Sequence, residues 1–317
     1  MSNSISIDVG YGDTKINYKG KNVKFPTSIS FYVDNGITYG DQKVYEFEGE
    51  KYIVGSEGLS GESFSTTDYN FLYKYAPLII YHILNKFDEV DKDRPVELKT
   101  GLALVDWQNR DEFKERLSHF VVDGQEINLN VKIVPQGVGI YLNFAKYGTL
   151  PEDIGDEDLK NLNVAIIDIG YGTINVLNMK NGKFIPSNSK SYPGHGVSSL
   201  IKPFRDYLEN KFKDPFSEQE ANEILYKGYF RYNGKKQKDI EEYIKDAKRK
   251  FIIKIFGSVL VESKKVFSLA DLVILSGGGS NFFEGVKLKD NMILDNSTII
   301  DGKPRREFSN VNGYYTL

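Results

Sequence analysis

The sequence predicts an α/β protein built from two related halves. Residues 7–12 read Ile-Asp-Val-Gly-Tyr-Gly and residues 167–172 read Ile-Asp-Ile-Gly-Tyr-Gly, so one six-residue pattern occurs twice with a single Val/Ile exchange. Each copy follows an apolar stretch typical of a buried strand and ends in a glycine-rich turn. Strand and helix patterns alternate along the rest of the chain, and 317 residues are enough for two lobes.

The first half begins with strands and continues with helices. Residues 15–25 alternate in polarity around a glycine, as a hairpin does, and a β-rich insertion covers about residues 21–70. Pro77 is expected to start or kink the first helix. The elements expected after the insertion are a helix at 71–87, a strand at 96–104, a helix at 108–121, a strand at 128–134 and a helix at 138–145.

The second half begins with the repeated strand and a second hairpin. A hairpin at 174–184 turns at Asn181-Gly182, so the repeat extends beyond the glycine turn. Ser217 and Glu220 have the spacing of a capping box at a helix start. The other expected elements are helices at 197–208, 217–226 and 240–267 and a buried strand at 272–275. The predicted domains are a first lobe at 1–147, a second lobe at 148–300 and a segment at 301–317 that returns to the first lobe.

Composition excludes several classes of protein. The formal net charge of −3 gives no overall attraction to nucleic acid or to anionic membranes, so direct contact with either is not expected. The absence of cysteine excludes disulfides and thiolate metal sites. No leader pattern precedes the first strand, and no apolar stretch approaches the roughly 20 residues needed to span a bilayer. These features predict a soluble, cytoplasmic protein.

The two glycine turns carry the predicted chemistry. Glycine has no Cβ, so the backbone N–H groups of each turn can point inward toward an anion such as a polyphosphate. The preceding carboxylates, Asp8 and Asp168, would repel phosphate directly and are suited to hold Mg²⁺ between themselves and the phosphates. The alternative is a pair of ordinary hairpin turns in which Asp and Gly serve local geometry only. Two copies of the pattern favour the phosphate interpretation.

The order of the motifs resembles that of the actin, DnaK-type chaperone and sugar-kinase superfamily. A strand with Asp-Gly-Tyr-Gly is followed by a strand with Pro135-Gln136-Gly137, by the second Asp-Gly-Tyr-Gly, and by a buried strand that leads into Gly277-Gly278-Gly279. The resemblance covers nearly the whole chain. It implies a duplicated, ribonuclease H-like two-lobe fold of the actin type, with ATP or GTP and Mg²⁺ in a cleft between the lobes.

Within this superfamily, the chain is most similar to the bacterial and archaeal actins, and especially to the ParM-type plasmid-segregation actins. Lys15 follows Asp8 by 15 − 8 = 7 residues, the spacing with which actin-like proteins place a lysine against the β- and γ-phosphates. Residues 310–314 resemble the returning end of the ParM type, whereas chaperones and sugar kinases are expected to be longer. The resemblance implies nucleotide contacts from Gly10, Tyr11, Gly12, Asp13, Thr14 and Lys15 in the first phosphate loop, from Gly170, Tyr171, Gly172 and Thr173 in the second, and from Gly277, Gly278 and Gly279 in the adenosine motif.

The resemblance assigns hydrolysis to Gln136, Asp168 and Asp8. Gln136 is expected to orient the attacking water as an uncharged donor and acceptor, although some ParM-type actins carry Glu at the matching position. Asp168 is expected to polarise that water or to hold Mg²⁺, and Asp8 and Asp168 are the candidate metal ligands. Glu223 and Lys227 lie four apart on a predicted helix and are candidates for ribose or adenine binding, with an exposed ion pair as the alternative.

Several residues have structural interpretations beside the functional ones. Tyr11 and Tyr171 either flank the phosphates or pack beneath the turns. His195, between two glycines, is interpreted as a loop residue before a helix. The basic runs at 235–238 and 248–250 are interpreted as solvated surfaces, with acidic filament neighbours or DNA as alternative partners.

The main functional hypothesis is an actin-like ATPase that assembles with itself into head-to-tail filaments and segregates plasmid or other DNA through a DNA-bound adaptor protein. The alternative is a non-polymerising small-molecule kinase of the sugar-kinase type, which would need a general base that the sequence does not clearly offer. Residues 31–55 are a candidate filament contact because Tyr32, Tyr39 and Tyr45 are expected to be exposed.

Overall fold

The computed structural model describes residues 3–34, 42–56, 68–87, 90, 94–155 and 157–317. The chain forms two compact units, the first made of Met1–Glu157 with Asp295–Leu317 and the second of Asp158–Leu294. The sequence prediction instead places the boundaries at 147/148 and 300/301. Two contacts explain the difference.

Both contacts hold the start of the returning segment to the first unit. The backbone N–H of Thr149 donates to Oδ1 of Asn296 at 2.9 Å, and Nδ2 of Asn296 donates to the carbonyl oxygen of Thr149 at 3.0 Å. Asn143 on helix α3 (Val138–Tyr147) donates from Nδ2 to the hydroxyls of Ser297 and Thr298 at 2.7 and 2.8 Å. Residues 148–157 and 295–300 therefore fold with the first unit, through contacts about 150 residues apart that no local pattern announces.

The main sheet of the first unit has six strands in the order β3-β2-β1-β7-β9-β8. Strands β1 to β3 form an antiparallel meander, β1, β7 and β9 run parallel, and β8 pairs antiparallel with β9. The strands are β1 (Ser4–Val9), β2 (Asp13–Tyr18), β3 (Lys21–Pro26), β7 (Val96–Leu102), β8 (His119–Val122) and β9 (Gln125–Pro135). Every side chain of β1 is buried, as expected for a strand that is covered on both faces.

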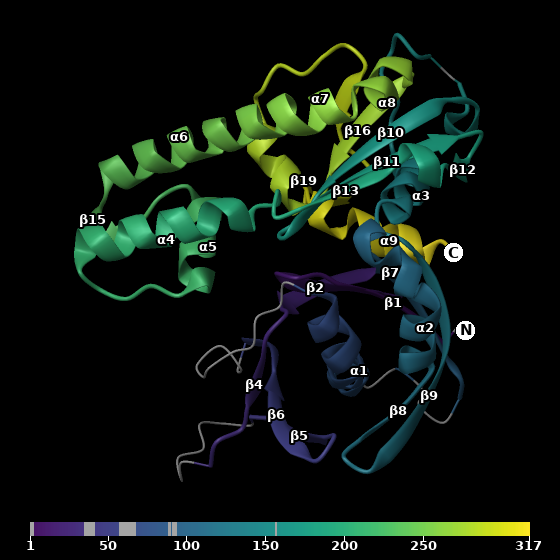
Figure 1. Ribbon diagram of the computed structural model, residues 1–317, viewed down its shortest axis with the longest axis vertical. Coiled ribbons are helices and arrows are strands. Elements are labelled where there is room, and N and C mark those ends of the chain that lie inside the picture. Colours follow the sequence, from purple (N-terminus) through teal and green to yellow (C-terminus); the bar gives the residue numbers. More distant parts are fainter. Residues whose placement is uncertain (1–2, 35–41, 57–67, 88–89, 91–93, 156) are drawn as a thin grey trace. The chain divides into compact units, whose positions relative to one another are not determined.

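Helix α1 (Tyr69–Lys86) packs between this sheet and a second, three-stranded sheet of the same unit (Figure 1). The second sheet has the order β4-β6-β5, with β4 at Ile29–Phe31, β6 at Glu50–Val54 and β5 at Val44–Phe47. The helix begins after Asp68, whose carboxylate accepts a hydrogen bond from the N–H of Phe71 at 2.9 Å. Pro77 therefore lies inside the helix and does not start it.

Tyr45 faces helix α1, so the prediction that it is exposed is wrong. It lies on the side of β5 that also carries Phe47, because side chains of a strand alternate between faces. Its ring meets Tyr81 edge-on, its hydroxyl lies 2.9 Å from Nδ1 of His82, and 3% of the residue is exposed. Tyr32 is half-buried, and Tyr39 lies outside the described residues.

The helix predicted at 108–121 is shorter than expected. The structure has a 3₁₀ helix η2 (Leu104–Asn109), then α2 (Arg110–Ser118), and residues 119–121 already belong to β8. Phe120 and Val122 are buried while their neighbours are exposed, so the two-residue period of a sheet edge ends the helix here.

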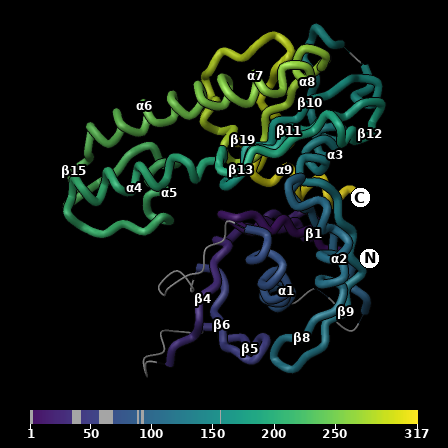
Figure 2. The backbone as a smooth tube through the Cα atoms, in the orientation of Figure 1, coloured from purple at the N-terminus to yellow at the C-terminus, as the bar shows by residue number. Residues whose placement is uncertain are grey.

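The end of the chain returns to the first unit. It passes through a short hairpin of β18 (Ile299–Ile300) and β19 (Lys303–Pro304), then a 3₁₀ helix η7 (Arg306–Phe308) and helix α9 (Ser309–Tyr315). Helix α9, yellow in Figure 2, packs against α3 and β1. A Cβ on Gly313 would lie 1.7 Å from the carbonyl oxygen of Gly139, so only glycine allows the backbones of α9 and α3 to approach this closely.

The second unit repeats the arrangement of the first. Its sheet has the order β12-β11-β10-β16-β17, with β13 also paired to β11. Strands β10 and β11 are antiparallel, whereas β10, β16 and β17 are parallel, so the predicted hairpin at 174–184 is confirmed. The strands are β10 (Asn163–Ile169), β11 (Thr173–Lys180), β12 (Lys183–Phe184), β13 (Lys190–Pro193), β16 (Leu272–Ser276) and β17 (Met292–Leu294), and short 3₁₀ helices lie at η3 (Leu159–Asn161) and η4 (Pro186–Asn188).

Helices α4, α5 and α6 extend from this sheet (Figure 1). The capping box is confirmed, because Ser217 Oγ accepts from the N–H of Glu220 at 3.1 Å and Glu220 Oε2 accepts from the N–H of Ser217 at 2.8 Å. The predicted helix at 240–267 is interrupted by a π turn and by a break at Ser263. The elements are α4 (Ser198–Phe212), α5 (Glu218–Lys227), β14 (Arg231–Tyr232), β15 (Lys235–Lys236), α6 (Lys238–Lys254), the π turn η5 (Ile255–Val259), α7 (Leu260–Glu262), α8 (Lys264–Leu269) and the 3₁₀ helix η6 (Gly278–Phe283). Within the described ranges, no helix has both the length and the apolar character needed to cross a bilayer.

Candidate functional site

The first glycine turn joins β1 to β2 and places a lysine ammonium beside its backbone. Asp8 is paired with Lys15 across the hairpin, and the N–H of Gly10 donates to the carbonyl oxygen of Asp13 at 3.2 Å. A Cβ at Gly10 would lie 2.8 Å from that oxygen and 2.9 Å from Nζ of Lys15. Glycine is therefore required for the turn to close around the lysine.

Gln136 completes this half of the site. Its Nε2 donates to Oδ1 of Asp8 at 3.1 Å, although the two residues are 128 positions apart. Asp8 is 5% exposed, and burial raises the pKa of its carboxyl group, while the charge of Lys15 and the hydrogen bond from Gln136 act in the opposite direction. Three residues that the sequence singles out, Asp8, Lys15 and Gln136, are thus brought together within the first unit.

The turn that carries Gln136 is braced by the end of the chain. The backbone N–H of Gln136 donates to the carbonyl oxygen of Leu102 at 2.9 Å, which fixes the end of β9 beside β7. The next residue, Gly137, has φ +93°, and its N–H donates to Oδ1 of Asn310 on α9 at 2.8 Å. Asn310 is therefore a positioning residue for the site, and a contact between distant segments gives no signal in a single sequence.

Other residues of the first turn point their side chains at their own hairpin and core. The hydroxyl of Tyr11 donates to Asp106 at 3.3 Å, and its ring packs against the core of the first unit. Burial raises the pKa of Tyr11, and the negative charge of Asp106 adds to the effect. Asp13 forms an ion pair of 3.2 Å with Lys24, and the hydroxyl of Thr14 lies 2.8 Å from that of Thr27. For Tyr11, these contacts support the packing interpretation.

The second glycine turn reproduces the backbone of the first. The N–H of Gly170 donates to the carbonyl oxygen of Thr173 at 2.9 Å, the same hydrogen bond that Gly10 makes in the first unit. Asp168 is paired across the hairpin with Asn175, which occupies the place that Lys15 has in the first unit. Asn175 is buried and its Oδ1 accepts from the hydroxyl of Ser191 at 2.5 Å. Only the first of the two turns thus has a cation at this register position.

A loop that sequence reasoning treated as a connection fixes the second turn. The N–H groups of Val197 and Ser198, at the start of α4, donate to the carbonyl oxygens of Gly170 and Tyr171 at 3.1 and 2.8 Å. A Cβ at Gly196 would lie 2.2 Å from the carbonyl oxygen of Tyr171. The sequence signal for this close approach of the loop to Tyr171 was the Gly-His-Gly pattern before an amphipathic helix. The residue that the approach requires is Gly196 and not His195.

Asp168 lies directly beside the Gly-Gly-Gly turn. It is 6% exposed and is paired with Ser276 on the parallel strand β16. Gly277 has φ +80°, and a Cβ there would lie 2.5 Å from Oδ1 of Asp168. A Cβ at Gly279 would lie 2.3 Å from the side chain of Ile169. These two glycines are therefore needed for packing, whereas Gly278 is half-buried.

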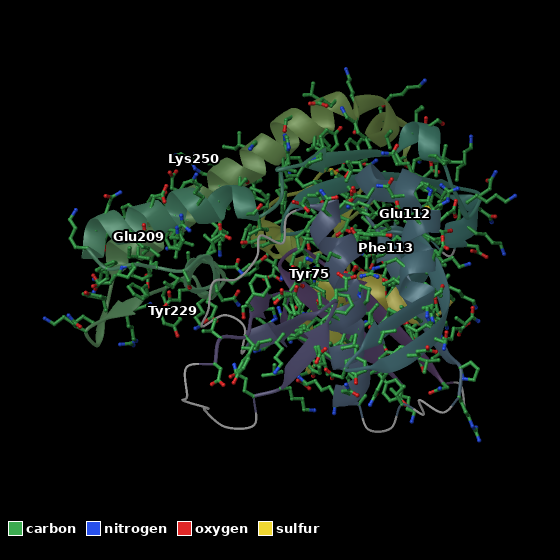
Figure 3. The ribbon with its side chains drawn as sticks, turned by 60° about the horizontal axis from the view of Figure 1, so that its bottom comes forward. Tyr75, Glu112, Phe113, Glu209, Tyr229 and Lys250 are labelled. Atoms are coloured by element: carbon green, nitrogen blue, oxygen red, sulfur yellow. The ribbon has the colours of Figure 1, made fainter. Side chains whose placement is uncertain are left out.

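Glu223 and Lys227 form the exposed ion pair that the sequence left as an alternative. Their carboxylate and ammonium groups are 3.1 Å apart, and each side chain is more than half exposed. Both line a cavity of about 330 Å³ on α5 together with aromatic residues, among them Tyr229, which is labelled in Figure 3. The ring of Tyr226, also on α5, lies 5.2 Å from that of Phe282 in η6, so this helix contacts the Gly-Gly-Gly segment.

Each unit by itself offers one buried carboxylate, Asp8 in the first and Asp168 in the second, that suits a magnesium ion held mainly by a bound phosphate, because oxygen ligands suit a hard cation. In the part of the chain that the structure describes, no group of three or more acidic, His or Cys residues is placed to hold a metal by itself. Mg²⁺ is usually bound by one or two carboxylates together with substrate phosphates, which matches this donor set.

Both halves of the chain match families of actin-like proteins. Residues 6–139 match the family described as actin like proteins N terminal domain, and residues 166–289 match the family described as archaeal actin homologue MreB-like, C-terminal. The chain belongs to the actin-like proteins. No curated protein sequence matches this one.

Solved structures share the fold of this actin-like protein over almost its full length. The complex of Ta0583, an archaeal actin homolog, with ADP is 20% identical, covers 99% of this chain and 98% of its own, and has a TM-score of 0.72. The pCBH ParM non-polymerisable quadruple mutant is 19% identical with coverages of 99% and 98% and a TM-score of 0.74. A 15-stranded ParM filament from Clostridium botulinum is 19% identical with coverages of 98% and 97% and a TM-score of 0.72. The predicted actin-like fold is confirmed.

Proposed function

We propose that this actin-like protein binds and hydrolyses a nucleoside triphosphate, ATP or GTP, and assembles into filaments when it does so. The observation that carries the proposal is the duplicated turn. Each unit has a buried Asp at the end of a strand, followed by a glycine whose N–H closes the same hydrogen bond. A packing role alone does not explain why both units carry the same acidic glycine turn, whereas binding of phosphate by each turn does.

In this proposal, the first turn binds the outer phosphates. The ammonium of Lys15 lies over Gly10, where it would offset the charge of the β- and γ-phosphates. Asp8 and Asp168 would hold Mg²⁺, which neutralises developing charge on the phosphates when it is bound. Gly277, Gly278, Gly279, Glu223 and Lys227 are proposed to contact the nucleoside.

Gln136 is proposed to orient the attacking water. Because its Nε2 donates to Asp8, the amide is held in one orientation and its Oε1 is the atom left to accept a hydrogen bond from water. A fixed, neutral acceptor aligns the water without adding negative charge beside the phosphates. Asp8 therefore acts on the reaction in two ways, as a proposed metal ligand and as the group that orients Gln136.

Assembly is proposed from the family and from the named structures. One solved structure of this fold is a ParM filament and another is an Alp12 filament. A head-to-tail contact joins two different surfaces and does not close, so growth continues at each end. A filament of this kind would move plasmid or other DNA through an adaptor protein that binds the DNA.

Light scattering of the purified protein with ATP and Mg²⁺, and separately with GTP and Mg²⁺, tests the proposal. A filament predicts a threshold concentration above which scattering rises, together with release of phosphate. A protein that stays monomeric at tens of micromolar across ordinary salt concentrations, yet transfers phosphate to a small molecule, would instead be a kinase of the sugar-kinase type.

A further inference from the structure

Helices α6 and α7 present an exposed face that the proposed nucleotide chemistry does not use. The opposite side of this helix buries Phe251, Ile255 and Val259 in the core of the second unit. We call the exposed side the outer face and define it by Arg249, Lys250, Ile253, Lys254, Gly257 and Val261. Lys250 on this face is labelled in Figure 3, and its side chain is 71% exposed.

A π turn lies within this helix. The N–H of Leu260 donates to the carbonyl oxygen of Ile255, five residues earlier, which is the wide hydrogen bond of a π turn. Ile255 and Val259, four residues apart, are buried on one side of the helix, whereas Ile253 and Val261 are 59% and 70% exposed.

The outer face carries more positive than negative charge. Its basic residues are Arg249, Lys250 and Lys254, and the acidic residue beside them is Asp246. Arg249 and Lys250 share the carboxylate of Asp246, at 3.3 and 2.7 Å. Lys254 has no acidic partner among the described residues, so the face retains an excess of positive charge.

An acidic segment of the same chain complements this face. Residues 152–158 contain five acidic residues and no basic one. Glu152, Asp153 and Glu157 are exposed and have no cationic partner in the part of the chain that the structure describes. A tight turn, in which the N–H of Gly155 donates to the carbonyl oxygen of Glu152 at 3.2 Å, holds this segment at the surface of the first unit.

We infer that the outer face binds Glu152, Asp153 and Glu157 of a second copy of this chain. The inference rests on the proposed filament function and names the two surfaces that carry one of its contacts. Opposite charges would steer and orient the copies, and the contact would remove Ile253 and Val261 from water. Because the two surfaces differ, the contact is heterologous and adds copies without closing.

An anionic membrane is the other surface that a basic face with apolar residues would suit. A membrane-binding helix normally inserts a wide apolar side, with aromatic or leucine residues, into the headgroup boundary. The outer face offers only Ile253 and Val261 within a basic surface, which favours a charged protein partner. The complementary acidic segment on the same chain favours a second copy as that partner.

Charge exchange tests the inference. The variant Arg249→Glu/Lys250→Glu and the variant Glu152→Lys/Asp153→Lys are each expected to raise the concentration needed for sedimentable polymer by about tenfold or more in ATP and Mg²⁺. The four-site variant, which combines both pairs of substitutions, is expected to form sedimentable polymer at a concentration within about threefold of the wild-type value. Val261→Asp, at a site that is 70% exposed, is expected to weaken assembly as the first variant does.

A matched control is Lys287→Glu/Lys289→Glu, which changes the net charge equally at exposed lysines outside the outer face and is expected to assemble as wild type. Binding of a fluorescent ATP analogue is measured for each variant and is expected to be unchanged. If wild type assembles but neither single-surface variant is impaired, or the four-site variant is not restored, the inference is overturned while the proposed function stands. Loss of binding to anionic vesicles with normal assembly would make the outer face a lipid surface and overturn it too. A wild-type protein that never assembles would overturn both.

Discussion

Replacing Gly277 with alanine is expected to destabilise the second unit by about 2–6 kcal/mol. Gly277 has φ +80° and ψ 167°, a backbone region almost restricted to glycine that costs another residue about 1–3 kcal/mol. The new Cβ would lie 2.5 Å from Oδ1 of Asp168 and 2.6 Å from the carbonyl oxygen of Ile169, and overpacking of this kind costs typically about 1–3 kcal/mol. The two effects add because strain at the turn and pressure on β10 are separate costs. Displacement of the Asp168 carboxylate is also expected to lower phosphate release.

The matched control is Gly257→Ala, which makes the same chemical change in an exposed helical segment. A Cβ at Gly257 would meet nothing within 4 Å, so the substitution is expected to stabilise the protein by about 0.5–1 kcal/mol. Urea unfolding followed by circular dichroism measures both variants against wild type, with the midpoint and the slope fitted separately. If Gly277→Ala unfolds at the wild-type midpoint, or if both variants shift in the same direction, the argument from close approach is wrong.

Three further predictions concern hydrolysis, the nucleoside and pH. Gln136→Ala and Asp168→Ala are each expected to lower phosphate release by on the order of 10² while nucleotide still binds, and wild-type turnover in both would remove their assigned roles. Gly278→Val is expected to weaken binding of a fluorescent ATP analogue, because a branched side chain on this half-buried glycine would occupy space that the nucleoside needs; unchanged affinity would make the turn purely structural. Burial, with smaller contributions from Lys86 and Lys43, lowers the pKa of His82 from 6.5 to about 4, so the unfolded chain binds the proton first as pH falls. The free energy of unfolding is therefore expected to fall by about 3 kcal/mol between pH 6.5 and pH 4. His82→Gln is expected to remove this share of the pH dependence, as measured by urea unfolding at each pH. Equal slopes of unfolding free energy against pH in the two proteins would contradict the prediction.

The end of helix α2 and the burial of Tyr45 show where local sequence patterns give the wrong prediction. Residues 119–121 continue a helical pattern, yet they pair with β9 because Phe120 is buried at the sheet edge. Tyr45 was predicted to be exposed as part of the β-rich insertion, whereas its strand turns it onto α1. In both cases packing against a distant segment outweighs the local preference, as tertiary context usually does.

The repeated Asp-Gly-Tyr-Gly pattern, the hairpins beside it and the capping box at Ser217 were determined by the sequence itself. Each depends on residues within a few positions, because strand alternation, glycine turns and helix caps are local physical effects. Asp8 and Lys15, paired in one hairpin, belong to this group. Only the tertiary structure decided that Gln136 reaches Asp8, that Asn310 braces Gly137 and that Gly277 leaves room for Asp168, since each contact joins segments more than 100 residues apart. Such contacts depend on how buried surfaces meet when the chain folds, and no period or spacing in the sequence records that.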